Sequence, residues 1–380
     1  MKYKYLITLS LSALVINATA QKSQVQIARN AVGKLQVAIA NGKEKKDQLT
    51  IIGEGIKASE SAEADKRTKN WPETWAVKAY LSSYVAIIDD NQSNSDLYFN
   101  KAQESLKNAV KLDRYQDNSR FIDATNYNLI IKKQDMGNRA FKDNDFATAF
   151  KSLKDVSDFF PTDTTLAVNA GIAAQNVQSL DEAEKYFKRA TDNGLKNPIV
   201  FQSMSKIYVS KFETELAIKI LETGIKINPY NEFLTNDYIN LLLDNERYPQ
   251  AAAAIESTLK IDVKNKLLYF LYGYLKQIEG NNPTAELSYK KALSLDQNYF
   301  NALYQLGITY LNFANTALQT NQQNSQKNFS AYINRSEFTL EQAYEINPND
   351  RQTVQLLIEI YTRKGKLDKV EDLKRKLQEF

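Results

Sequence analysis

Apolar side chains recur along this chain at the three- and four-residue spacing of an α-helix, with short polar breaks between the periodic segments. Residues 22–41 show this spacing, and a second periodic segment covers residues 44–61. The stretch Ala62–Asn70 is charged and has no period, so it predicts a loop before the helix that Pro72 begins. No segment reads convincingly as a β-strand. The pattern predicts an all-α protein.

Small residues recur in register every 34 residues. Alanine does so at Ala149, Ala183, Ala217, Ala251 and Ala285, and glycine at Gly137, Gly171, Gly273 and Gly307. A large apolar residue follows each of these alanines by four positions, at Leu153, Phe187, Leu221, Ile255 and Tyr289. Residues four apart share one face of a helix, and two helices cross closely only where one side chain is small. The period therefore predicts a stack of paired helices.

These positions match the consensus of a known repeat. The best match is Leu303, Leu306, Gly307 and Tyr310, and the unit with Gly171, Ala183, Phe187 and Ala190 is nearly as good. The chain resembles the tetratricopeptide repeat (TPR) family, in particular secreted or periplasmic TPR proteins of Bacteroidetes. The resemblance implies an all-α, right-handed superhelical solenoid of about eight units, of which the first two are degenerate. Ser205 and Ile239 replace the glycine, which predicts a looser helix crossing there.

The two degenerate units precede the regular array. Trp75 occupies the aromatic position of the family, and Ala102, Leu106 and Ala109 mark the partner helix. The segment Asp89–Ser95 between them predicts a turn longer than that of the family. We expect four parts: a signal peptide at 1–20, degenerate helical repeats at 21–122, the regular array at 123–380, and within it a C-terminal capping repeat at 351–380.

The unit that begins near residue 303 departs from the period. Its second helix ends with Leu340, Ala343 and Pro348, which implies an insertion of about 17 residues relative to the 34-residue repeat. We expect a long hairpin at 303–348, with both helices lengthened near 313–330 and an exposed tip at Gln319–Gln326. A disordered loop rich in Asn and Gln is the alternative.

The first twenty residues have the pattern of an export signal. Lys2 and Lys4 precede an apolar run from Leu6 to Ile16, and Ala18-Thr19-Ala20 has the small-x-small form of a cleavage site. The apolar run is too short to span a bilayer, which takes about 20 residues. We expect cleavage after Ala20 and a periplasmic or secreted protein. Because the chain contains no cysteine, we expect no lipid anchor and no disulfides.

The composition narrows the possible chemistry. The chain contains neither histidine nor cysteine, which removes Ser/His/Asp and Cys/His nucleophiles and the usual zinc ligand sets. Paired acidic residues, such as Glu182 with Glu184, lie near predicted helix starts, where they complement the helix dipole. The formal net charge of +4 gives no electrostatic argument for a nucleic-acid partner. We expect no enzymatic activity, no cofactor and no metal site.

The resemblance implies a binding groove, because the first helix of each TPR unit lines the concave face. Carried over position by position, the expected groove residues are Gln134, Asn138, Phe141, Gln175, Asn176, Gln202, Lys206, Asn236, Asn240, Phe270, Tyr274, Gln277 and Tyr304. Side-chain amides bond to the backbone of an extended peptide, and aromatic rings supply contact area. A solvated surface with aromatic rings packed between units is the alternative.

The family's clamp for a terminal carboxylate is not matched. Asn138 and Asn169 stand at its two asparagine positions, but Gln134, Ile199 and Ser203 stand where it requires cations. Two functions follow from the pattern. The first is a periplasmic interaction scaffold for a peptide or partner protein. The second is a protein that captures a glycan or oligopeptide for an outer-membrane uptake system. The pattern does not predict an oligomeric state.

Overall fold

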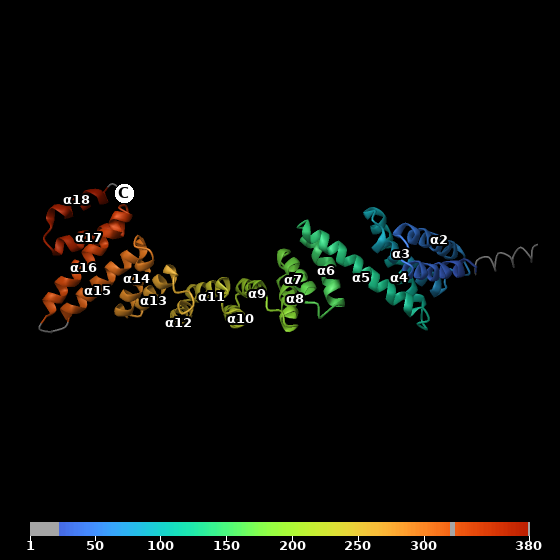
Figure 1. Cartoon of the computed structure of the whole chain (residues 1–380), viewed down its shortest axis with the longest axis horizontal. Coiled ribbons are helices and arrows are strands. Elements are labelled where there is room, and N and C mark those ends of the chain that lie inside the picture. The colour runs from blue at the N-terminus through green and yellow to red at the C-terminus, as the bar shows by residue number, and fades with distance from the viewer. Residues whose placement is uncertain (1–22, 320–323, 379–380) are drawn as a thin grey trace, which may run out of the picture. The chain divides into compact units, whose positions relative to one another are not determined.

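The computed structural model describes residues 23–319 and 324–378, and all of the regular structure in them is helical. Successive helices pair into antiparallel hairpins (Figure 1). After a helix over residues 23–40 come α2 (Lys45–Ala64), α3 (Pro72–Ile88), α4 (Gln92–Leu112), α5 (Ser119–Lys142), α6 (Phe146–Phe159), α7 (Thr164–Asn176), α8 (Leu180–Asp192), α9 (Pro198–Ser210), α10 (Thr214–Ile227), α11 (Glu232–Asp244), α12 (Tyr248–Leu259), α13 (Lys266–Ile278), α14 (Asn282–Leu295), α15 (Phe300–Gln319), α16 (Ser325–Ile346), α17 (Arg351–Arg363) and α18 (Leu367–Leu377).

Several helices begin where an asparagine or aspartate side chain caps them. In the regular array the cap of each first helix recurs with the repeat, at Asp163, Asn197, Asn231 and Asn265. The side-chain oxygen of each cap accepts a hydrogen bond from a backbone N–H of the first turn; for Asn231 the donor is Leu234 N, at 2.9 Å. Such a cap typically contributes about 1 kcal/mol. Local sequence therefore sets where these helices start.

The turns inside the hairpins share one backbone conformation. A residue with positive φ stands between the two helices at Asn144, Gln178, Phe212, Glu246 and Gly280, again at the repeat spacing. The following residue donates its N–H to a carbonyl five positions back, as Glu213 does to Tyr208. This is the Schellman ending of a helix, which normally favours glycine. Only one of the five is glycine, so the turn geometry is imposed by the repeat.

The glycine and alanine lattice lies where the two helices of a hairpin cross. A Cβ atom added to Gly171 would lie 2.7 Å from Cε1 of Phe187, and Ala183 is fully buried. The same close approach pairs Gly137 with Leu153, Gly273 with Tyr289 and Gly307 with Leu340. Where the glycine is missing, α9 with α10 and α11 with α12 pack less extensively than α13 with α14. The predicted helix crossings are confirmed, including the looser ones.

Two predictions about the degenerate repeats are wrong. The connection between α3 and α4 is three residues, Asp89–Asn91, and therefore shorter than expected. Asn91 caps α4 by accepting from Asn94 N, and Ser95 donates to Ala86 O, so residues 92–95 belong to the helix. In addition, α2 continues to Ala64, so the first part of the expected loop Ala62–Asn70 is helical.

The long hairpin has two lengthened helices, as predicted. The helix α15 has 20 residues and α16 has 22, whereas α13 has 13. The exposed tip is shorter than Gln319–Gln326, because Gln319 ends α15 and Ser325 begins α16. The rest of the expected tip, residues 320–323, lies outside the described residues.

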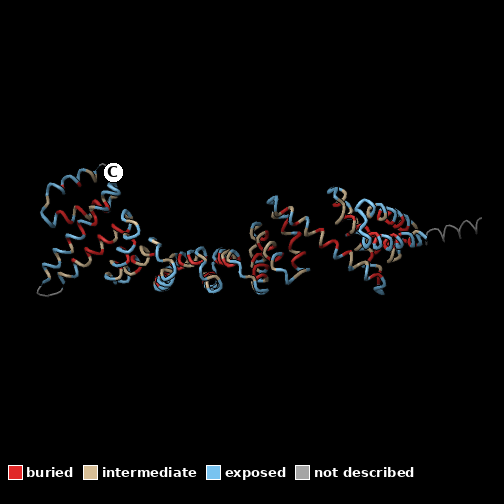
Figure 2. The backbone as a smooth tube through the Cα atoms, in the orientation of Figure 1, coloured by how far each residue is buried: buried red, intermediate tan, exposed pale blue. Residues whose placement is uncertain are grey.

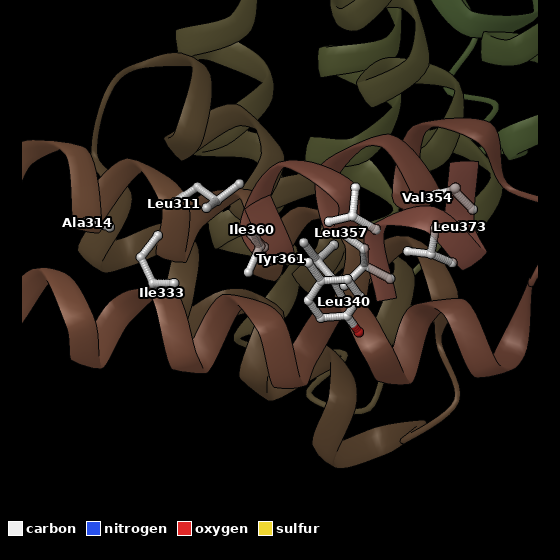
Figure 3. Close-up of a cluster of buried hydrophobic side chains, with 10 residues drawn as sticks. Leu311, Ala314, Ile333, Leu340, Val354, Leu357, Ile360, Tyr361 and Leu373 are labelled. Carbon is white, nitrogen blue, oxygen red and sulfur yellow. The ribbon is translucent and has the colours of Figure 1, made fainter. Parts of the chain in front are cut away.

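A cluster of apolar side chains joins this hairpin to the last one (Figure 3). Leu311 and Ala314 of α15 and Ile333 of α16 belong to it with Leu357 and Ile360 of α17. Ile360 and Ala314 are fully buried. A large apolar side chain such as Ile360 contributes about 1.5–3 kcal/mol on burial. The lengthened helices are therefore part of a continuous core.

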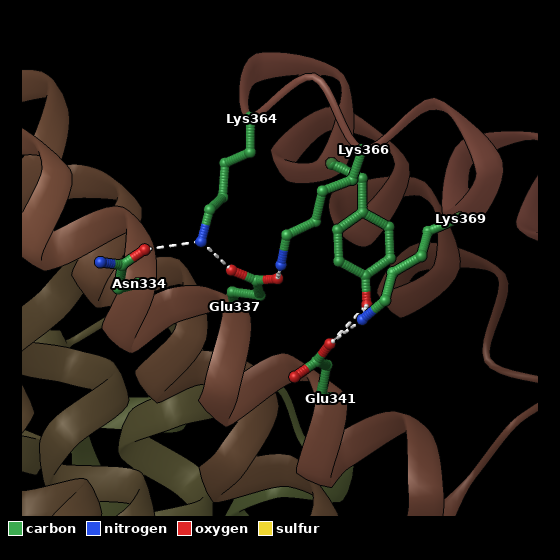
Figure 4. A network of polar contacts seen from close by, with 7 residues as sticks. Asn334, Glu337, Glu341, Lys364, Lys366 and Lys369 are labelled. Carbon is green, nitrogen blue, oxygen red and sulfur yellow. Dashed lines mark hydrogen bonds and ion pairs between the residues drawn. The ribbon is translucent and has the colours of Figure 1, made fainter.

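Ion pairs cover the edge of that core between α16 and the α17–α18 loop (Figure 4). The carboxylate of Glu337, which is 8% exposed, accepts from Lys364 and Lys366. Burial raises the pKa of Glu337, but the hydrogen bonds and charges of the two lysines outweigh burial, so this pKa lies below its usual value. Next to it, Glu341 accepts from the Tyr361 hydroxyl at 2.6 Å and from Lys369 at 2.9 Å. The C-terminal capping hairpin is therefore held to α16 by ion pairs as well as by apolar packing.

The hairpins number nine within the described residues, against about eight expected. They form two compact units, residues 23–195 and 196–378 of the described chain, and the buried residues of both lie mainly on the inner sides of the hairpins (Figure 2). The boundary at 122/123 marks where the repeat becomes regular in sequence and stays a prediction. The right-handed superhelix also stays a prediction. No helix in the described part of the chain is both long and apolar enough to cross a membrane.

Candidate partner-binding surface

The thirteen expected groove residues lie on the first helices of their hairpins, and none of them is buried. Five belong to α5 and α7 in the first compact unit, and eight belong to α9, α11, α13 and α15 in the second. The exposed ones are Asn138, Asn176, Lys206, Asn236, Asn240 and Tyr274, and the half-buried ones are Gln134, Phe141, Gln175, Gln202, Phe270, Gln277 and Tyr304. Each compact unit therefore has its own set of accessible groove residues.

In the first unit the residues have local contacts. Asn176 donates to Ile172 O of its own helix at 2.9 Å, and Phe141 packs edge-on against Phe146 with ring centroids 5.5 Å apart. Phe141 thereby belongs partly to the core of the α5–α6 hairpin. Asn138 is exposed, as Asn176 is.

In the second unit one amide joins neighbouring first helices. Gln202 of α9 donates to the carboxylate of Asp237 on α11, at 2.6 Å. This bond holds α9 and α11 side by side, which is the arrangement that a groove lined by first helices needs. Asn236 and Asn240 flank Asp237 on α11 and are exposed. Both residues are therefore accessible to solvent or to a ligand.

The aromatic residues divide between packing and surface. The Phe270 ring lies 6.0 Å from the Tyr289 ring and 5.4 Å from the Tyr299 ring, so it belongs to the core between α13, α14 and α15. Tyr274 stacks on Phe270 with 6.4 Å between centroids and is 42% exposed. The alternative of rings packed between helices therefore holds for Phe270, whereas Tyr274 offers its outer side.

Two further residues have structural partners. Gln277 accepts a hydrogen bond from the hydroxyl of Tyr289 at 2.6 Å. Tyr304 stacks on Phe300 and donates to Gln352 at 3.1 Å. Both support neighbouring elements, so a ligand would have to compete with these contacts.

The sequence reading missed three exposed apolar residues in the same register. Ile199, Phe233 and Leu267 each stand two positions after the capping asparagine of α9, α11 and α13, and they are 59%, 72% and 51% exposed. Singly exposed apolar residues are common, but three at one repeated position form a row. The signal was their 34-residue spacing. We name Ile199, Phe233 and Leu267 the apolar row.

The expected groove residues carry little charge. Among the expected residues only Lys206 carries a charge. Ile199 is an exposed apolar residue at one of the three positions where a carboxylate clamp requires a cation. Within residues 23–319 and 324–378, no group of three or more metal-ligating side chains is close enough to hold an ion. The set of expected groove residues is therefore largely uncharged.

Hairpins repeated at 34 residues and crossed at glycine and alanine define an all-α helical-repeat fold, which resembles that of tetratricopeptide repeat proteins. The chain is similar to solved structures of that type. They include YrrB, described as a TPR protein with an unusual peptide-binding site (15% identity, 54% of this chain and 96% of that chain, TM-score 0.40). Two others are TPR proteins from Cytophaga hutchinsonii (12%, 63% and 92%, 0.48) and Bacteroides fragilis (21%, 62% and 98%, 0.32). No protein-family model matches the sequence, and no curated protein is significantly similar to it.

Proposed function

We propose that this protein is a non-enzymatic interaction scaffold of the periplasm, which binds an extended peptide or one face of a partner protein on its first helices. The periplasmic location rests on the signal-peptide pattern of residues 1–20, which lie outside the described residues. The binding role rests on the surface of the second unit.

The observation that supports binding most directly is the apolar row beside exposed amides. Phe233 is 72% exposed, and Asn236 and Asn240 follow it on the next two turns of α11. An apolar side chain in water gains free energy when a partner covers it, and an adjacent amide can bond to the partner's backbone. The exposed apolar position recurs on α9 and α13, where Gln202 and Phe270 stand three positions after it.

The experiment is photo-crosslinking in intact cells. A photoreactive residue at Asn240 should capture a partner, and the capture should be lost when the apolar row is changed to serine (Ile199→Ser, Phe233→Ser, Leu267→Ser). The matched control changes three apolar residues of second helices with a similar range of exposure, Leu216, Leu287 and Phe338, to serine. Equal capture by both triple variants would contradict the proposal.

The long hairpin is the second place where a partner could bind. Removing residues 316–328 shortens α15 and α16 and leaves the first helices α9, α11 and α13 intact. We expect the shortened protein to retain the partner captured at Asn240. Loss of capture would place the binding surface on the hairpin.

A further inference from the structure

The second unit contains a cavity of about 330 Å³ at the loops that join α10 to α11 and α12 to α13. Its walls are mainly apolar and include Ile225, Tyr230, Ala254, Ile261 and Leu268. Engineered apolar cavities of about 150 Å³ bind benzene, so this space is large enough for an aromatic ring.

One residue that lines the cavity is smaller than its counterparts in the two neighbouring hairpins. Thr235 lines it, and the residues 34 positions before and after Thr235 are Phe201 and Tyr269. Phe201 is 2% exposed and packs into the core of its own hairpins. In this part of the array an aromatic ring therefore occupies the position that threonine leaves open.

The residue that faces Phe201 across the hairpin also differs from its counterpart one repeat later. A Cβ atom added to Gly224 would lie 2.9 Å from Cβ of Phe201, so glycine makes room for the ring. The residue 34 positions after Gly224 is Thr258, which also lines the cavity. A phenylalanine facing a glycine in one hairpin is thus replaced by two threonines in the next.

The hydroxyl groups of Thr235 and Thr258 form their hydrogen bonds within their own helices and do not require a hydrogen-bond partner in the cavity. The Thr235 hydroxyl donates to Asn231 O at 3.2 Å, and the Thr258 hydroxyl donates to Ala254 O at 2.8 Å. Because both donors are satisfied within their own helices, the cavity is suited to an apolar occupant.

The charges at the cavity are of one sign. Glu232 and Asp262 are the only charged residues among those that line it. Asp262 accepts from the Asn265 amide at 2.8 Å, and Glu232 is exposed. The Tyr230 ring beside them is 79% exposed and extends the apolar wall outward. An apolar hole with carboxylates and no cation in its lining complements an aromatic side chain next to a basic one.

We propose that this cavity is the anchor site for the partner: it takes an aromatic side chain of the bound polypeptide, with an adjacent lysine or arginine facing Glu232 and Asp262. This proposal rests on the proposed function and names the chemistry of the segment that is bound. The partner's ring occupies the place that Phe201 fills in the preceding hairpin.

The test uses blocked dipeptides as probes and the full-length protein. Binding of N-acetyl-tryptophanyl-arginine amide is followed by ligand-observed NMR, with the alanyl-arginine and tryptophanyl-glutamate amides as comparisons. Loss of the aromatic ring should weaken binding at least about tenfold, as at buried aromatic anchors. Reversal of the charge should weaken it about threefold to tenfold.

The decisive variant fills the cavity with the pair of residues that the preceding hairpin has at the same repeat positions. Thr235→Phe with Thr258→Gly reproduces the Phe201–Gly224 pair, and a circular dichroism spectrum and melting temperature equal to those of the wild type verify its fold. The variant should lose the tryptophanyl-arginine probe. A folded variant that binds the probe as the wild type does, or a wild type that binds all three probes alike, would overturn the proposal. So would a wild type that binds none of them.

Failure of this inference is distinguishable from failure of the scaffold proposal. If the filled variant still captures the partner at Asn240 while the apolar-row variant does not, the scaffold stands and the anchor site is wrong. If the control triple variant loses capture as the apolar-row variant does, the scaffold proposal fails, and binding of the dipeptides still decides the cavity.

Discussion

At the scale of single residues, the repeat imposes conformations that the local side chain does not favour. Phe212 has φ of 61° and is 94% exposed, so its ring gains little from packing while its backbone is in the left-handed region. That region costs a residue with a Cβ atom about 1–2 kcal/mol. The surrounding hairpin, held by the Glu213 to Tyr208 backbone bond, sustains this conformation.

Phe212→Gly should therefore stabilise the protein by about 0.5–1 kcal/mol. The substitution removes the backbone strain, and part of this gain is offset because glycine has more conformational entropy in the unfolded chain. The measurement is the midpoint of urea unfolding. Phe212→Ala is the control, because alanine keeps the Cβ atom and should give no comparable gain. Equal effects of the two substitutions would show that the φ angle is not the cause.

Glycine has the opposite role at the helix crossings. Gly171→Ala places a methyl group 2.7 Å from Cε1 of Phe187, and we expect it to destabilise by about 1–3 kcal/mol. The control is Gly53→Ala in α2, where nothing lies within 4 Å of the added Cβ. There we expect a gain of about 0.5–1 kcal/mol from helix propensity. A stabilising effect at Gly171 would contradict the packing argument.

At the scale of elements, the last hairpin depends on Glu337. Its pKa in the folded protein is below the usual 4.5, so its ionised form stabilises the fold above that pH. The stabilisation is lost as the pH falls through the lowered pKa. It comes from charge-assisted hydrogen bonds with Lys364 and Lys366, which link α16 to the loop before α18.

Glu337→Gln should destabilise the protein at pH 7, by about 1–3 kcal/mol, because two lysines lose their common acceptor. At pH 3 the difference between variant and wild type should be smaller, since the wild type loses this stabilisation as the pH falls from the usual pKa of Glu337 through its lowered pKa. Urea unfolding at both pH values measures this. A difference that is unchanged at pH 3 would mean that Glu337 acts through packing rather than charge.

At the scale of the whole molecule, each helix packs mainly against helices close to it in sequence. In such an array the effect of a substitution should stay near its position. Gly307→Ala brings a methyl group 2.5 Å from Cγ of Leu340, between α15 and α16. Gly171→Ala makes the corresponding change between α7 and α8 in the other compact unit.

Hydrogen exchange followed by mass spectrometry tests this locality. Gly307→Ala should speed exchange in α15–α18 and leave α5–α8 unchanged, and Gly171→Ala should do the reverse. Each variant is the control for the other. Faster exchange throughout the chain in either variant would indicate one cooperative unit.

Much of the fold was predictable because its determinants are local and repeat in register. The spacing of Gly171 and Ala183 predicted the crossing, since two helices approach this closely only where a small residue faces a large one. The short α3–α4 connection was not predictable from length alone, because Asn91 and Ser95 decide it through hydrogen bonds to backbone groups. Among the groove residues, the sequence could not separate Phe270, which packs against Tyr289, from Tyr274, which is exposed.

The amino-acid sequence by itself determined the all-α class, the period, the hairpin crossings and the starts of the capped first helices in the regular array, because each depends on residues a few positions apart or one repeat apart. Tertiary structure alone decided which side chains are accessible and where space remains. The sequence shows that Thr235 stands between Phe201 and Tyr269 in the repeat. Only the packed helices show that no neighbour fills the gap, because packing is set by all the surrounding side chains together.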